Sequence, residues 1–387
     1  MTRRKISILG ATGSVGTSTL DLVERQPDRF EVVALTASKQ VGSLADAAIR
    51  TNARLAVIDD PALLPELQDR LRTSGCHAAT GRDALFKAAA GEAGWVMAAI
   101  VGCAGLEPVM AAIETGRTVA LANKEALVTA GQLMIAAAKR SGATILPVDS
   151  EHNAIFQCLA DNRSGDVAKL VLTASGGPFR SWSRDQMAAA TPEQAVAHPN
   201  WSMGAKISVD SATMMNKGLE LIEASHLFGV PSDRLEVVVH PQSVIHSMVE
   251  YVDGSVLAQL GSPDMRIPIA HALAWPERME TPAAKLDLAK IGTLSFEAPN
   301  LDQFPALCAA RGALEAGGAA PIVLNAVNEE AVAAFLARRI GFLDIVSTVE
   351  EALNRTGATA PRSIAEVIDI DRDARALAHS LMSEMAA

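Results

Sequence analysis

The sequence predicts a multidomain α/β protein with a mainly parallel sheet near its N-terminus and a helical region at its C-terminus. The chain has 387 residues, which is too long for one ordinary domain. Short apolar runs alternate with Ala-rich helical stretches up to about residue 150, which is the pattern of consecutive βαβ units. From residue 301 onward the pattern is helical and is broken only by Gly and Pro.

The first part of the chain supplies the strands of the predicted parallel sheet. Apolar runs predict strands over 5–9, 30–36, 55–58, 95–101, 118–121 and 143–148. Helical patterns lie between them at 17–26, 44–51 and 61–74. Strict alternation of the two places helices on both faces of one sheet.

The regular alternation of predicted strands and helices ends after residue 150. A strand over 169–174 runs into the loop Ser175-Gly176-Gly177-Pro178, and residues 244–251 and 255–260 flank Asp253-Gly254 as an antiparallel hairpin. Residues 191–206 contain two prolines and are expected to form a mobile loop. Helices are expected at 304–315, 321–338, 343–354 and 364–385. We therefore predict an N-terminal domain (1–149), a central α+β domain (150–273) with a lid loop (195–206), a linker (274–300) and a C-terminal helical domain (301–387).

Composition excludes several classes of function. The 34 Lys and Arg face 44 Asp and Glu, and a net charge of −10 argues against non-specific binding to nucleic acid or a membrane surface. No apolar run approaches the roughly 18 residues of a membrane span. The basic start is followed by an apolar segment too short for a signal peptide, so a cytoplasmic protein is expected. The four cysteines form no CxxC pair and are expected to be reduced thiols.

A glycine-rich turn follows the first predicted strand and opens the first helix. Gly10, Gly13 and Gly16 permit a tight turn and let backbone N–H groups approach a pyrophosphate at the positive end of the helix. The spacing GxxGxxG is a weak signal alone, and a tight turn without a ligand is the alternative. Its place in a βαβ run favours a Rossmann-like dinucleotide site.

The end of the second predicted strand indicates which nicotinamide nucleotide binds. NAD sites usually carry an Asp or Glu here, but this strand runs into Ser38-Lys39-Gln40, and the next acid is Asp46. A Lys beside small polar residues suits a 2′-phosphate, so NADPH is predicted over NADH. The alternative is that Lys39 is a solvated loop lysine.

Asp149 and Glu151 follow the last N-terminal strand. If the backbone stays extended, both carboxylates point to one face and offer a site for a hard cation. Alternatively, Asp149 or Ser150 caps a helix over 152–159 and Glu151 interacts with its dipole. The local sequence slightly favours the cap.

A second polar segment, residues 210–220, changes that balance. On a helix, Asn216 and Glu220 share a face and Lys217 lies three residues before Glu220. An amide, a cation and an acid together suit a metal ion beside a phosphate. A solvated helix surface with an ordinary Lys–Glu pair is the commoner outcome of such spacing.

Several longer motifs, taken together, resemble one family over essentially the whole chain. They are GATGSVG (10–16), LANKE (121–125), PVDSEH (147–152), ASGGPF (174–179), HPNWSMGAKI (198–207), DSATMMNKGLE (210–220), HPQS (240–243) and GSPDMR (261–266). In these motifs the chain resembles the 1-deoxy-D-xylulose 5-phosphate reductoisomerases. The family usually has Gly-Lys-Asn where this chain has Ser38-Lys39-Gln40, a departure that keeps the Lys.

The resemblance implies a set of site residues. Asp149, Glu151 and Glu220 would bind one divalent cation, Mg²⁺, Mn²⁺ or Co²⁺. The substrate phosphate would be held by Ser175, Ser211, Asn216 and Lys217 with His198 close by, and the reacting carbons would be contacted by Lys124, Ser150 and Glu151. NADPH would be contacted by Thr12, Gly13, Ser14, Val15, Ser38, Lys39, Gln40, Asn123, Glu125 and Gly204. Trp201 and Met203 would lie on the lid.

The implied activity is an NADP-dependent oxidoreductase reaction on a small phosphorylated sugar, carried out by a homodimer. The cation would act as a Lewis acid in the rearrangement of an α-hydroxy ketone, and NADPH would then reduce the resulting aldehyde. Two rivals remain: a semialdehyde-type dehydrogenase with a nucleophilic Cys103, and an NADPH-sensing protein without catalytic activity. His152, His240 and His246 are expected to be structural.

Overall fold

A computed structural model describes residues 3–159, 164–201, 203–357 and 359–386, and these divide into two units. The first unit comprises Met1–Ala126, Met134–Asn153 and Asp264–Ala284. The second comprises Leu127–Leu133, Ala154–Pro263 and Lys285–Ala387. Each unit collects segments that are distant along the chain. The division into three domains with a linker stays a prediction.

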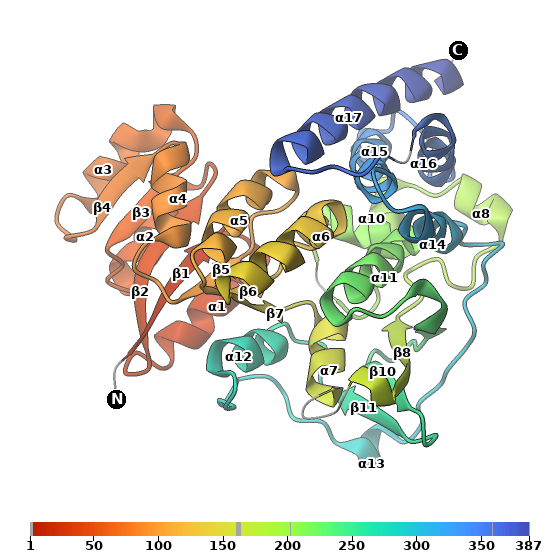
Figure 1. Cartoon of the computed structure of the whole chain (residues 1–387), viewed down its shortest axis with the longest axis horizontal. Coiled ribbons are helices and arrows are strands. Elements are labelled where there is room, and N and C mark those ends of the chain that lie inside the picture. Colours follow the sequence, from red (N-terminus) through yellow and green to blue (C-terminus); the bar gives the residue numbers. More distant parts are fainter. Residues whose placement is uncertain (1–2, 160–163, 202, 358, 387) are drawn as a thin grey trace. The chain divides into compact units, whose positions relative to one another are not determined.

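Within the described part of the first unit, a seven-stranded sheet has the order β4-β3-β2-β1-β5-β6-β7 (Figure 1). Every neighbouring pair is parallel. The strands are β1 (Arg4–Leu9), β2 (Phe30–Ala37), β3 (Leu55–Ile58), β4 (His77–Thr80), β5 (Trp95–Ala98), β6 (Thr118–Leu121) and β7 (Thr144–Pro147). The predicted Rossmann-like sheet is confirmed. Sequence patterns missed β4, whose four residues include no Val, Ile or Leu.

Each strand of this sheet is followed by a helix. These helices are α1 (Ser14–Glu24), α2 (Val41–Arg50), α3 (Leu64–Leu71), α4 (Arg82–Ala90), α5 (Leu106–Glu114), α6 (Lys124–Ser141) and α7 (Ser150–Cys158). The sequence did not distinguish α4, α5 and α6 from the apolar runs beside them. Helix α6 is kinked at Ala130, and only the first turn of α7 belongs to this unit.

Helix α12 (Arg266–Ala274) also packs in the first unit. It contacts α1, and the indole Nε1 of Trp95 donates to the carbonyl of Ala272 at 3.1 Å. The guanidinium of Arg4 donates to the carbonyl of Leu273 at 2.5 Å. Residues 264–273, which the sequence placed in the central domain, are therefore tied to the N-terminal sheet.

The described residues of the second unit form a four-stranded sheet with the order β11-β10-β8-β9. Its strands are β8 (Val167–Ala174), β9 (Leu235–Val239), β10 (Ile245–Tyr251) and β11 (Val256–Leu260). Strands β10 and β11 pair antiparallel, which confirms the predicted hairpin, whereas β8 and β9 are parallel. Residues 285–300, expected to be part of a linker, pack on this sheet: Val239 and Glu297 exchange both backbone hydrogen bonds at 2.8 and 2.9 Å.

Helices cover the second sheet and form the C-terminal region. They are α8 (Arg184–Ala188), α9 (Pro192–Val196), α10 (Ala205–Thr213), α11 (Met215–Phe228), α13 (Leu288–Ile291), α14 (Ala306–Ala316), α15 (Ala320–Leu336), α16 (Asp344–Arg355) and α17 (Ile364–Ala386). Helices α14 to α17 pack against one another, as the predicted helical bundle requires. Among the described residues, no helix combines the length and apolar character that crossing a bilayer requires.

Residues 191–206 are not wholly irregular, which corrects the sequence prediction. Thr191 and Gln194 form a capping box, in which the Thr191 side chain accepts from the Gln194 N–H and the Gln194 side chain accepts from the Thr191 N–H. This pattern starts α9, with Pro192 in its first turn. The predicted lid loop (195–206) thus begins in α9 and ends in α10, and its described residues between the two helices form no regular element; Ser202 lies outside the described residues.

The core of the second unit is mainly aliphatic and includes a cluster of aromatic rings. Buried residues of β8 such as Leu170 and Leu172 meet apolar residues of α11, α14 and α15. The ring of Phe179 lies 4.4 Å from that of Trp182 and packs edge-on at 4.9 Å against Phe342. This core fixes α11, the helix that carries the predicted Asn216, Lys217 and Glu220, against the sheet.

Candidate active site

The glycine turn of the first unit has geometry that only glycine satisfies. Gly10 has φ of +82°, and a Cβ atom there would lie 2.5 Å from the carbonyl oxygen of Ala99. A Cβ atom on Gly16 would lie 2.2 Å from the carbonyl oxygen of Gly10. The N–H of Gly10 donates to Oγ1 of Thr36 at 2.9 Å, which ties the turn to β2. The two glycines let α1 start directly against the end of β1.

The N-terminus of α1 is suited to an anionic ligand. Its N-cap residue, Gly13, makes no side-chain cap, and the first turn holds no acidic residue. Gly13 and Ser14 are exposed, and Thr12 and Val15 are half-buried. The first N–H groups of a helix need partners from outside it, and the helix dipole favours negative charge at this end.

The segment Ser38-Lys39-Gln40 follows β2 and is exposed. Gln40 is the N-cap residue of α2 and makes no side-chain cap. These residues follow the strand next to the glycine turn in the sheet, which is where the ribose of a dinucleotide lies in this fold. The preference of Lys39 for a 2′-phosphate stays a prediction.

Asn123 organises the loops that follow β5 and β6. Its Oδ1 accepts from the N–H of Ala126 at 3.0 Å and caps α6, while its Nδ2 donates to the carbonyl of Gly102 at 2.9 Å. The side chain is 2% exposed. Cys103 begins a 3-10 turn after Gly102, which has φ of +71°. Cys103 therefore lies at a tight turn.

Asp149 combines the two roles that the sequence left open. Its Oδ1 accepts from the N–H of Glu151 at 3.1 Å, which is a helix cap, and its Oδ2 accepts from Nζ of Lys124 at 3.0 Å. The Ser150 hydroxyl donates to Oε2 of Glu151 at 2.5 Å. Carboxylate oxygens of Asp149 and Glu151 lie within 4.8 Å of each other. Four residues predicted for the site are therefore together at the start of α7.

Two structural residues support this cluster from the same unit. Nδ2 of Asn153 donates to the carbonyl of Pro147 at 2.9 Å and lies 3.2 Å from Nδ1 of His271. Burial lowers the pKa of His271 to about 4, and the charge of Arg278 adds to the effect. The neutral ring can accept the amide proton at Nδ1. This pair was not predicted from local patterns, because 118 residues separate its members.

The second unit brings Ser175 and His198 together. Nε2 of His198 lies 2.8 Å from Oγ of Ser175. Nδ1 of the same ring accepts the N–H groups of Asn200 and Trp201 at 3.2 and 3.0 Å. A neutral ring with an acceptor at Nδ1 carries its proton on Nε2, so His198 donates to Ser175. This directs the Ser175 hydroxyl proton toward another acceptor.

The loop after β8 also approaches Ser211. Gly177 has φ of +65°, and a Cβ atom there would lie 2.5 Å from the carbonyl oxygen of Ser211. The N–H of Gly177 donates to Oγ of Ser175 at 3.1 Å. Two of the residues expected to bind phosphate, Ser175 and Ser211, thus lie on backbone segments in contact with each other.

Helix α11 carries the predicted Asn216, Lys217 and Glu220 on one face. Oε1 of Glu220 accepts from Nδ2 of Asn216 at 2.6 Å, and Oε2 accepts from the Lys217 ammonium. Glu220 is 0% and Lys217 is 4% exposed. The solvated-surface alternative is therefore wrong, because both charged side chains are buried. Charged side chains are rarely buried unless they are paired with each other.

The expected lid residues lie on the segment before α10. Nδ2 of Asn200 donates to the carbonyl of Pro241 at 2.6 Å and lies 3.2 Å from Oγ of Ser243. The Trp201 ring is 6.0 Å from that of His246. Met203 is half-buried, and the exposed Gly204 is the N-cap residue of α10. His240 is structural as expected: Nδ1 donates to the carbonyl of Ser295 and Nε2 accepts from the Val244 N–H.

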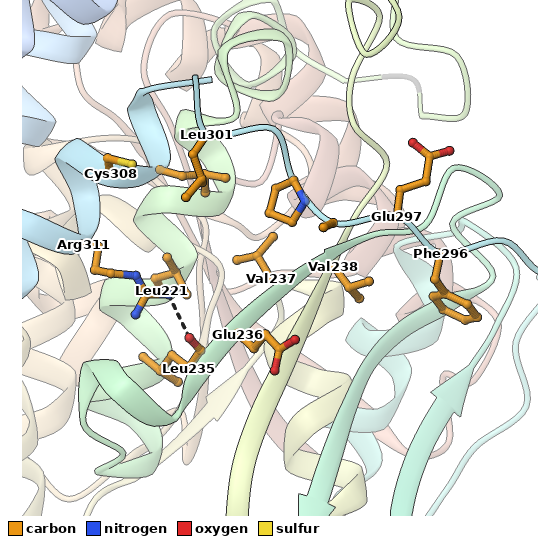
Figure 2. Close-up of a pocket in the computed structure, with 13 residues that line it drawn as sticks. Leu221, Leu235, Glu236, Val237, Val238, Phe296, Glu297, Leu301, Cys308 and Arg311 are labelled. Carbon is orange, nitrogen blue, oxygen red and sulfur yellow. Dashed lines mark hydrogen bonds between the residues drawn. The ribbon is translucent and has the colours of Figure 1, made fainter. Parts of the chain in front are cut away.

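A pocket of about 600 Å³ lies elsewhere in the second unit, between β9, α14 and the segment from Phe296 to Leu301 (Figure 2). None of the predicted site residues lines it. Arg311 donates to the carbonyl of Leu235 at 2.8 Å and to the backbone and side chain of Ser232. Its guanidinium is therefore engaged by the protein, and we assign the pocket no catalytic part.

Comparison with known protein families matches nearly the whole chain. The N-terminal model of 1-deoxy-D-xylulose 5-phosphate reductoisomerase matches residues 6–131, its C-terminal domain model matches 145–228, and the DXP reductoisomerase C-terminal domain model matches 260–377. The chain belongs to this family. That membership excludes the semialdehyde-type dehydrogenase built on Cys103.

Individual relatives agree over their full lengths. The reductoisomerase of Zymomonas mobilis is 59% identical over 99% of this chain and 99% of its own, and that of Rhodospirillum centenum is 58% identical over 99% and 94%. The structure of the Zymomonas mobilis enzyme with NADPH superposes with a TM-score of 0.94 at 58% identity, covering 98% of this chain and 99% of that one. A DOX-P reductoisomerase with NADPH, fosmidomycin and magnesium gives 0.93 at 44% identity, covering 99% of both chains.

Proposed function

We propose that this protein converts 1-deoxy-D-xylulose 5-phosphate to 2-C-methyl-D-erythritol 4-phosphate with NADPH and a divalent cation, in the non-mevalonate route to isoprenoids. Family membership over the whole chain carries this proposal, and relatives with NADPH and magnesium bound support both cofactors. Each group of residues that the chemistry needs is present in the chain.

Asp149, Glu151 and Glu220 would bind the cation. Carboxylate oxygens are the ligands that Mg²⁺ and Mn²⁺ prefer, so the donor set fits a hard or borderline divalent ion, Mg²⁺, Mn²⁺ or Co²⁺. The existing bonds support pre-orientation: backbone N–H groups and Lys124 hold Asp149, and Ser150 holds Glu151. Glu220 is held by Asn216 and Lys217.

The nucleotide would lie on the first unit's glycine turn. Backbone N–H groups of Thr12 to Val15 would meet the pyrophosphate, and Ser38, Lys39 and Gln40 would meet the 2′-phosphate. Asn123, Glu125 and Gly204 complete the proposed contacts. The uncapped and exposed start of α1 supports this assignment.

The substrate phosphate would be held by Ser175, Ser211, Asn216, Lys217 and His198. His198 donates to Ser175 and so frees the Ser175 hydroxyl proton for a phosphate oxygen.

Lys124, Ser150 and Glu151 would contact the reacting carbons, where Lys124 can hold a proton beside the Asp149 carboxylate. Trp201 and Met203 would exclude water when the lid closes. When bound, the cation supplies Lewis acidity and NADPH supplies hydride.

A homodimer located in the cytoplasm belongs to the same proposal. Strand β11 is an edge of its sheet, and its Val256 and Leu257 are 49% and 46% exposed. An exposed apolar edge strand is a natural surface for pairing with a second copy. Sedimentation of the native chain tests this part directly.

The deciding assay is NADPH oxidation with 1-deoxy-D-xylulose 5-phosphate, with Mn²⁺ and with EDTA, before and after alkylation of Cys103. We expect activity that EDTA abolishes and that alkylation leaves within about threefold. A chain that binds NADPH but oxidises none with this substrate and Mn²⁺ would instead be a nucleotide sensor, and the proposal would be wrong.

A further inference from the structure

A buried polar link joins the C-terminal helical region to the helix that follows the lid segment. Nδ2 of Asn328, on α15, donates to Oδ1 of Asp210, on α10, at 2.8 Å. Asp210 is 1% exposed and Asn328 is 0% exposed. The bond spans 118 residues of sequence and lies wholly within the second unit.

The other oxygen of Asp210 binds the first turn of α10. Oδ2 of Asp210 is 2.9 Å from Nζ of Lys206, one helical turn earlier and 26% exposed. Gly204 makes no side-chain cap for α10. The Lys206–Asp210 ion pair is therefore a side-chain interaction that stabilises the first turn of α10, where the lid segment ends. A buried carboxylate needs both charge and hydrogen-bond compensation, and here a cation and an amide divide that task.

The residue after Asp210 is Ser211, a proposed phosphate ligand. Helix α10 ends at Thr213, and the next residue, the buried Met214 with φ of +65°, caps both α10 and α11, the helix that carries Asn216. A shift of α10 would therefore move the lid base, Ser211 and the start of α11 together.

We infer that Asn328 is a positioning residue for substrate binding, which acts by orienting Asp210 so that it holds Lys206 at the base of the lid. This inference rests on the proposed role of Ser211 in binding phosphate. It predicts that the C-terminal helical region affects affinity for the phosphorylated substrate more than affinity for NADPH, because Gly204 is the one proposed NADPH contact at the start of α10.

Asn325 provides a matched control on the same helix. It is also an asparagine, also 0% exposed, and its Oδ1, like that of Asn328, has no hydrogen-bond partner among the described residues. Its Nδ2 donates at 3.3 Å to Glu329, which lies on its own helix, and not to α10. Loss of either amide removes a hydrogen bond to a carboxylate and should destabilise the fold, but only Asn328 should affect the substrate.

The experiment compares KM, kcat and melting temperature for Asn328→Ala and Asn325→Ala. We expect Asn328→Ala to raise the KM for 1-deoxy-D-xylulose 5-phosphate about tenfold, with kcat and the KM for NADPH within about threefold of native. Asn325→Ala should also lower the melting temperature but leave all three kinetic values within about threefold of native. If Asn328→Ala and Asn325→Ala have the same kinetics, the inference is wrong. If Asn328→Ala does not fold, Lys206→Met replaces it with the same expectation.

A swap separates positioning from simple packing. Asp210→Asn with Asn328→Asp keeps a donor and an acceptor in contact but removes the carboxylate from the helix that carries Lys206. The melting temperature should recover relative to Asn328→Ala while the substrate KM stays raised, and a native KM in the swap would overturn the inference. Ser211→Ala is measured alongside, because an unchanged KM there would contradict the proposed phosphate ligand itself.

Discussion

The acidic groups proposed to bind the cation are held in different ways in the two units. In the first unit, the Asp149 side chain is 17% exposed and is oriented by a backbone N–H of its own helix and by Lys124. In the second unit, Glu220 is 0% exposed and is held by Asn216 and Lys217, one of which is a buried cation. The first arrangement depends on the backbone at a strand end, and the second on side-chain pairs inside a packed helix.

This difference teaches that the two units tolerate substitution differently. A group fixed by backbone can lose one side-chain partner and keep its direction. Lys124 is 8% exposed and Lys217 is 4% exposed, so in either unit an acid that loses its charge leaves a buried cation with less charge compensation. Asp149, however, keeps the hydrogen bond from the backbone N–H of Glu151. The following changes test this comparison, from the largest expected effect to the smallest.

Glu220→Gln should have the largest effect. It removes a proposed cation ligand and the negative charge that Glu220 places beside the buried Lys217 ammonium, so we expect kcat to fall about 10³-fold. NADPH binding, measured by fluorescence, should be unchanged because the nucleotide is proposed to lie mainly on the first unit. Glu236→Gln, on the exposed part of β9, is the control. A Glu220→Gln rate within threefold of native would remove Glu220 from the site.

Gly16→Ala should destabilise the first unit by about 2–4 kcal/mol. The new Cβ would lie 2.2 Å from the carbonyl oxygen of Gly10, both on backbone that cannot move independently. Gly13→Ala is the matched control for stability, because the nearest atom to its Cβ would be 3.5 Å away. Urea unfolding measures both, and equal stabilities would show that the close approach at Gly16 is not needed.

Lys39→Ala should change specificity without affecting the second unit. If Lys39 binds the 2′-phosphate, its loss should lower the ratio of kcat/KM for NADPH to that for NADH about tenfold, the worth of about 1.4 kcal/mol. The KM for the sugar phosphate should stay constant. If the variant retains its preference for NADPH, Lys39 is a solvated loop lysine that does not bind the 2′-phosphate, as the alternative interpretation holds.

The smallest expected effect is the pH dependence caused by His271. Its pKa is lowered to about 4 in the folded protein, against an ordinary value near 6.5. As pH falls through 6.5 the unfolded chain gains a proton that the folded chain does not, so stability should fall between about pH 6.5 and 4 and level off below. Between pH 6.5 and 4 the melting temperature of the native chain should fall by about 2–4 °C more than that of the His271→Gln variant. Identical slopes in both proteins would show that His271 titrates normally.

The sequence predicted the first unit well because its signals are local. Strand β3 was predicted over 55–58, and the glycine turn was located from its spacing together with its place between a strand and a helix, because both signals depend on neighbouring residues. The capping box that starts α9 is equally local and was missed. The helices α4, α5 and α6 were also missed, because Ala-rich apolar runs do not distinguish helix from strand.

The second unit was less predictable because its contacts are distant in sequence. Asn216 and Glu220 share a helix face as spacing predicts, but that spacing did not reveal their burial. The bonds His198–Ser175 and Asn328–Asp210 join residues 23 and 118 positions apart, which only tertiary packing brings together. The roles of these residues were accessible through family resemblance or through the fold, and not through local pattern.

The central claim is that acids from both units bind one cation. Titration of the native chain with Mn²⁺, followed by electron paramagnetic resonance, should give one bound ion per chain. Asp149→Asn and Glu220→Gln should each weaken Mn²⁺ binding at least about tenfold while NADPH binding stays native. Mn²⁺ binding that is lost in Asp149→Asn but unchanged in Glu220→Gln would contradict a shared site.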